Sequence, residues 1–114
     1  PIIVFNGGAM ALNTTAQTND TWLLEAVLTC RAIGASTSAN MMGTGSFVSR
    51  TLLNAPAVGT TVGVGVEMLP DTAPAVGTGF DSTITNVVDL FATWSVSNAS
   101  NSIQLHQYSL ESLN

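Results

Sequence analysis

The last third of the chain alternates between apolar and polar residues over two long stretches, residues 81–96 and 102–113. The apolar side of the first stretch consists of Val88, Leu90, Ala92, Trp94 and Val96. A two-residue period places these side chains on one face of an extended strand, and the polar residues 97–101 between the stretches are typical of a hairpin turn. We therefore predict that the chain ends in a β-hairpin whose Val88, Leu90 and Trp94 face fills a hydrophobic core.

Further alternating segments precede this hairpin. We predict strands at residues 1–5, 21–33, 46–52 and 60–69, separated by turns and loops rich in Gly, Pro, Asn and Ser at residues 34–40, 54–56 and 70–79. In residues 21–33 the side chains of Trp22, Leu24 and Cys30 share one face, which predicts that the Cys30 thiol is buried. A helix is the alternative for this segment, but its apolar residues lack the i, i+3, i+4 spacing of a helix face.

Short strands separated by turn residues, without a sustained helical period, are typical of an antiparallel sandwich or barrel. With 114 residues, the chain has the size of one ordinary domain. We predict an all-β protein in which residues 1–114 form a single domain of roughly six to eight strands.

Charged residues make up only 8% of the chain, and its only basic residues are Arg31 and Arg50. With a formal net charge of −5, the chain lacks the basic surface that binds nucleic acid or an anionic membrane. No apolar run approaches the roughly 20 residues of a membrane-spanning helix. Because Ser, Thr and Asn replace charged residues, a neighbouring subunit can cover the surface at little desolvation cost. This favours a chain that works in an assembly; a monomer kept soluble by its acidity is the alternative.

The residue types that carry catalysis are scattered. His106 is the only histidine and has no Cys, Asp or second His close to it in the sequence, so it predicts neither a metal site nor a catalytic triad. Asp71 and Asp81 flank a Gly/Pro loop, where a weak cation site is the alternative. Trp22 and Trp94 lie on apolar faces, which favours the core over a sugar-stacking platform. We predict a protein that is not an enzyme, with no catalytic, cofactor-binding or metal-binding residues and no cofactor.

The closing stretches of the chain and two segments upstream of them also carry a family resemblance. The residues that carry it are Val88-Asp89-Leu90-Phe91-Ala92-Thr93-Trp94, Ala99-Ser100-Asn101-Ser102-Ile103-Gln104-Leu105, the closing Glu111-Ser112-Leu113, and upstream Asp20-Thr21-Trp22-Leu23-Leu24-Glu25-Ala26 and Gly45-Ser46-Phe47. Together they resemble small bacteriophage virion structural proteins that decorate the head or form a fibre or spike tip. The resemblance covers about half of the chain.

The resemblance implies a jelly roll of the tumour-necrosis-factor/C1q type, a β-sandwich that assembles as a homotrimer. It further implies a protein made in the cytoplasm of the bacterial host and carried on the surface of the virion, where it contacts other virion proteins. A receptor- or glycan-binding head for host attachment is the alternative function. In a trimer, the face opposite the core is covered by a neighbouring subunit, and there we predict subunit contacts at Phe91, His106 and Tyr108.

Overall fold

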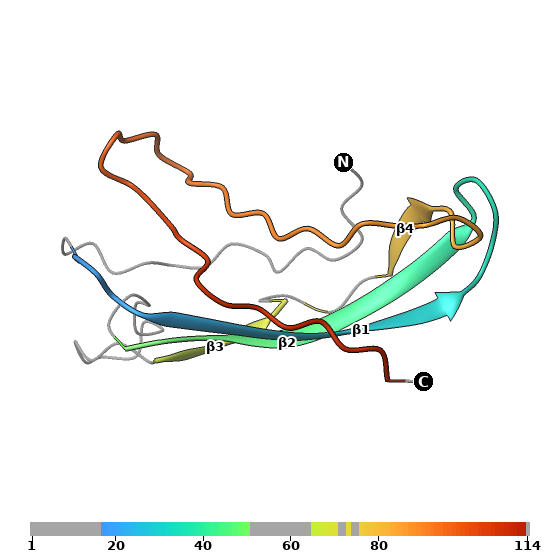
Figure 1. The fold of residues 1–114 in the computed structure, drawn as a ribbon, viewed down its shortest axis with the longest axis horizontal. Coiled ribbons are helices and arrows are strands. Elements are labelled where there is room, and N and C mark those ends of the chain that lie inside the picture. Colours follow the sequence, from blue (N-terminus) through green and yellow to red (C-terminus); the bar gives the residue numbers. More distant parts are fainter. Residues whose placement is uncertain (1–16, 51–64, 71–72, 74–75, 114) are drawn as a thin grey trace.

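The computed structural model describes residues 17–50, 65–70, 73 and 76–113. These residues contain no helix and four strands, which are β1 (Trp22–Ala32), β2 (Ala39–Ser49), β3 (Val66–Leu69) and β4 (Gly77–Phe80). They form one open antiparallel sheet with β2 in the middle (Figure 1). β1 pairs along one edge of β2, while β3 and β4 pair with different parts of it. The described residues are thus consistent with the all-β prediction. The predicted strand at residues 1–5 lies outside them.

The longest ladder joins β1 to β2. Its register runs from Trp22 opposite Ser49 to Ala32 opposite Asn40, with a bulge between Cys30 and Ala32. The strand predicted at residues 21–33 is confirmed, and the helix alternative is wrong. Alternating apolar residues suit a strand that covers a core on one face, and the start of β1 follows that pattern, with Trp22 and Leu24 half-buried and Leu23 exposed.

β2 begins earlier than the sequence predicts. Residues 43–45, a Gly-Thr-Gly run placed before the predicted strand, lie inside it. The reason is the close approach of β1. A Cβ atom on Gly45 would collide with the backbone oxygen of Glu25, so the strand requires glycine at this position. Glycine here permits strand pairing instead of ending it.

A second difference occurs in the predicted loop at residues 70–79, which contains the start of β4. Asn40 of β2 lies opposite Thr78, whereas Ala39 lies opposite Phe80, so Gly79 is an extra residue in the ladder. Gly79 has a φ of 96°, a conformation that glycine adopts without strain. A bulge built on glycine therefore lets this segment join the sheet.

The hydrophobic core lies at one end of the sheet. Phe47 of β2 and Leu69 of β3 are buried, and the half-buried Trp22 and Leu24 of β1 pack against them. The rings of Trp22 and Phe47 stack with centroids 5.9 Å apart and an interplanar angle of 15°. The predicted core position of Trp22 therefore agrees with its packing. The prediction of a buried Cys30 is wrong, because the core covers only the start of β1, around Trp22 and Leu24, and leaves this thiol near the other end exposed.

Residues 84–113, here called the terminal arm, contain no strand. The predicted turn is present, since the N–H of Asn101 donates to the carbonyl oxygen of Asn98 at 3.0 Å. The strands predicted on either side of it are not formed. Both stretches are drawn out along the molecule (Figure 1), but no ladder joins them to each other or to the described sheet. The alternation predicts an extended chain, yet a strand also requires a backbone partner, and the described residues supply none.

The predicted core face of the arm is correspondingly open. The exposed fractions are 59% for Val88, 53% for Leu90 and 37% for Trp94. The prediction that this face fills a core is therefore wrong for the described residues, which form a single sheet without a second layer.

Candidate assembly surface

The segment just before the terminal arm is hydrogen-bonded to the loop between β1 and β2. Ser82 donates its N–H to the carbonyl oxygen of Gly34 at 3.0 Å, and Gly34 donates its N–H to Ser82 Oγ at 2.9 Å. Ser82 Oγ also lies 3.2 Å from the Gly34 carbonyl oxygen, as a donor. These bonds join residues 48 positions apart in the sequence, so the arm leaves the sheet from a defined point.

The carboxylate of Asp81 reinforces this junction. Its Oδ2 accepts the N–H of Ser36 at 2.7 Å, and its Oδ1 accepts the N–H and the hydroxyl of Thr83 at 2.8 and 2.6 Å. The hydroxyl of Thr83, followed by its backbone N–H and that of Ser36, lowers the pKa of Asp81 below its ordinary value of 3.8. The alternative role of this residue, a cation site shared with Asp71, involves a position outside the described residues.

Acidification should therefore weaken the hydrogen bonds that Asp81 makes at this junction. A carboxyl whose pKa is depressed by folding adds stability above its ordinary pKa, and this contribution is lost as the pH falls through the lower folded value. We expect Asp81→Asn to lower the unfolding midpoint relative to the wild type at pH 6, and the two midpoints to converge as the pH falls below about 3.8. Thr83→Val should give a smaller effect of the same sign. Urea titrations from pH 7 to pH 2.5 measure this, and a constant difference across that range would contradict it.

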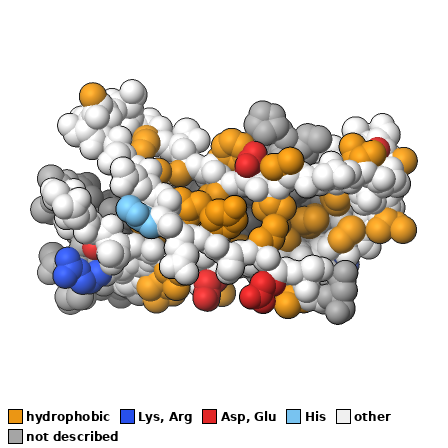
Figure 2. Space-filling model, viewed as in Figure 1, with side chains coloured by type: hydrophobic (Ala, Val, Ile, Leu, Met, Phe, Trp, Pro, Cys, Tyr) orange, Lys and Arg blue, Asp and Glu red, His pale blue; other side chains and the backbone are white. Residues whose placement is uncertain are grey.

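Beyond this junction, the terminal arm carries most of the exposed apolar surface. The described residues include 19 exposed large hydrophobic side chains, and 12 of these belong to the arm. They are Ile84, Val87, Val88, Leu90, Phe91, Trp94, Val96, Ile103, Leu105, Tyr108, Leu110 and Leu113. In the space-filling view, hydrophobic side chains form a band along the molecule, with only a few charged side chains beside it (Figure 2). An apolar surface of this extent is typical of an interaction site.

The residues predicted for subunit contact lie within this arm. The exposed fractions of Phe91 and Tyr108 are 62% and 80%, and His106 is also exposed. By the alternation, His106 and Tyr108 share one face of their stretch with Leu110, while Phe91 lies on the face of its stretch opposite Leu90 and Trp94. The three side chains are therefore accessible, and their role as contacts stays a prediction.

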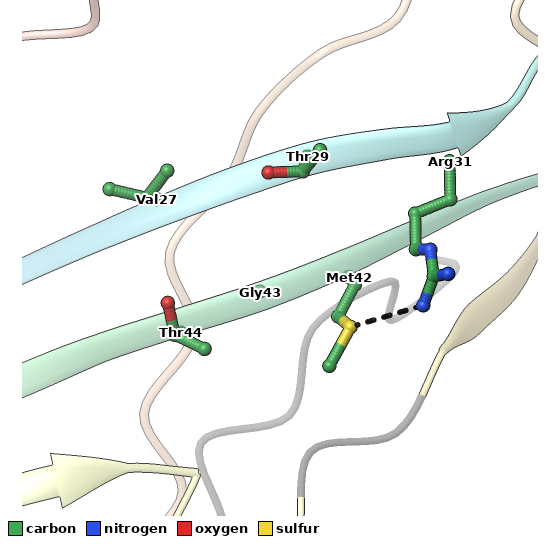
Figure 3. Close-up of a pocket in the computed structure, with 6 residues that line it drawn as sticks. All are labelled: Val27, Thr29, Arg31, Met42, Gly43 and Thr44. Carbon is green, nitrogen blue, oxygen red and sulfur yellow. Dashed lines mark hydrogen bonds between the residues drawn. The ribbon is translucent and has the colours of Figure 1, made fainter.

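A shallow hollow lies across β1 and β2 (Figure 3). It measures about 250 Å³ and is lined by Val27, Thr29, Arg31, Met42, Gly43 and Thr44. Arg31 extends along one side of it, where its Nη1 atom donates to Met42 Sδ at 3.6 Å. The lining offers one cation, two hydroxyls and apolar atoms, without a carboxylate or a second ionisable group. This set can bind a side chain, and it does not supply a nucleophile together with a base.

In the part of the chain that the structure describes, no group of three or more His, Cys, Asp or Glu side chains could hold a metal ion. Within the same residues there is no helix that could cross a membrane.

Sequence reasoning missed the junction between the arm and the β1–β2 loop. The bonds from Thr83 to Asp81 could have been predicted, because an Asp followed two residues later by Thr is typical of an Asx turn, in which the Asp side chain accepts the N–H of the Thr. The bonds to Gly34 and Ser36 leave no periodic signal in the sequence, since these two residues lie in a loop.

Comparison of the chain with models of known protein families, with curated proteins and with solved structures finds no match.

Proposed function

We propose that this protein is a non-enzymatic structural component of a bacteriophage virion, a homotrimer on the particle surface that decorates or stabilises the capsid or forms the knob of a fibre or spike. The observation that carries the proposal is the terminal arm, because a chain with 12 large exposed hydrophobic side chains in its last third requires a partner surface. The sequence resemblance supplies the virion context and the trimer.

Charge supports self-association over other partners. The terminal arm contains two carboxylates, Asp89 and Glu111, and neither Lys nor Arg. Copies of such an arm meet with little like-charge repulsion and with few ionised groups to strip of water. In the assembled protein, the terminal arm would supply further strands of the jelly-roll sandwich implied by the resemblance.

Size in solution tests the proposal first. One chain has a mass of 11.7 kDa, so light scattering of the purified protein at micromolar concentration should give about 35 kDa for a trimer. Electron microscopy of particles labelled with an antibody to the chain should then place the label on the particle surface. A stable 11.7 kDa monomer, or label absent from intact particles, would contradict the proposal.

A further inference from the structure

The outer edge of β1, the edge that does not face β2, is a strand edge without a ladder partner among the described residues. β1 has 11 residues, and its Leu23 and Val27 side chains are 53% and 55% exposed. A free edge of this length presents a row of backbone donors and acceptors that readily pair with another extended chain. β1 therefore offers a site for one more strand.

Residues 103–113 of the terminal arm fit that site in length and pattern. These 11 residues are extended along the molecule, and no strand ladder joins them to another described segment. Ile103 and Leu105 lie on one face, Tyr108 and Leu110 on the other, and Glu111 is the only residue with a formal charge. Such a segment can satisfy its backbone groups by joining a sheet edge, the mode called β-augmentation.

We propose that residues 103–113 of each copy add as a strand to the outer edge of β1 in a neighbouring copy. The inference rests on the self-association proposed above and names the surfaces that carry it. Each copy then gives one arm and receives one arm, a head-to-tail contact that closes into a ring at three copies. Tyr108, within the donated strand, would be an aromatic anchor of the contact, the kind of residue that dominates interface energies.

Cysteine pairing between differently tagged chains tests the exchange, because Cys30 on exposed β1 is the only native cysteine. One chain keeps Cys30. The other carries Cys30→Ser with one arm substitution, taken in turn from Gln104→Cys, Leu105→Cys, His106→Cys and Gln107→Cys. Neither chain can form a disulfide within itself. After co-expression and mild oxidation, a covalent heterodimer should form for one or two of the four positions, since disulfides require Cα atoms about 4.4–6.8 Å apart. Ala99→Cys in the turn is the matched control and should give at least fivefold less heterodimer.

A second set of chains separates exchange from closure within one copy. Chains that carry both Cys30 and one of the four arm cysteines should form intermolecular disulfides at the positions that gave heterodimers. If they instead form intrachain disulfides, and the mixed chains give no heterodimer above the control, the arm pairs with its own β1 and the inference is overturned. A mass of about 35 kDa in that case leaves the proposed function standing, whereas a monomer removes both.

Discussion

Phe47→Ala should destabilise the protein by about 3 kcal/mol, because a buried aromatic side chain is replaced by a methyl group and its packing contacts are lost. Phe47 is 4% exposed, stacks on Trp22 and packs with Leu69, the other buried member of its cluster among the described residues. Since small proteins are stable by about 5–15 kcal/mol in total, this loss is a large part of what holds the sheet together. Urea unfolding followed by circular dichroism, at one fixed protein concentration, measures it.

Met68→Ala is the matched control for that substitution. Met68 lies next to Leu69 on β3 but is 68% exposed, so its truncation should change the free energy of unfolding by less than about 0.5 kcal/mol. Equal losses for the two variants would mean that the core is not centred on Phe47.

Gly45→Ala should cost roughly 1–3 kcal/mol, which is the usual range for forcing an extra group into a packed site. The new Cβ would meet the carbonyl oxygen of Glu25 and the Cα of Ala26, both backbone atoms of β1. Backbone atoms cannot rotate away as a side chain can, so β1 and β2 must separate at the centre of their ladder. The expected signs are a lower urea midpoint and faster hydrogen exchange in β1 around Ala26.

The control for Gly45→Ala is Thr44→Ala, one residue earlier in β2. Thr44 is exposed and lines the hollow beside Val27, so removing its hydroxyl and methyl groups leaves the ladder intact. Its loss of stability should stay under about 1 kcal/mol. A Thr44→Ala effect as large as that of Gly45→Ala would contradict a steric role for the glycine.

The sequence predicts β1 well and the terminal arm only in part, for one physical reason. Alternation reports that a segment is extended and has one apolar face; it does not report which backbone lies beside it. For β1 the partner is the next segment of the chain, joined by a short loop, so local pattern and pairing agree. For the arm, Val88 and Leu90 alternate equally well, yet no described segment pairs with them in a ladder.

Glycine accounts for the other differences. At Gly45 and Gly79 the residue signals a break when the sequence is considered alone, and in the structure it admits a neighbouring backbone or a bulge. The candidate contacts at Phe91 and Tyr108 come from the sequence alone, as large side chains on nominally polar faces, and the structure adds that both are exposed. The hydrogen bond from the Ser36 N–H to the Asp81 carboxylate could not be predicted, since no periodic pattern links two loops 45 residues apart.

β2 pairs with β4 and with β3 at different positions, and this determines where the sheet can bend. β4 pairs with residues 39–41 and β3 with residues 45–48, so residues 42–44 have β1 as their only ladder partner among the described residues. Two three-stranded regions of the sheet are thereby joined by a narrow two-stranded region. Torsion applied at one end will concentrate in the two-stranded region, and the sheet can change its twist there while both three-stranded regions keep their shape.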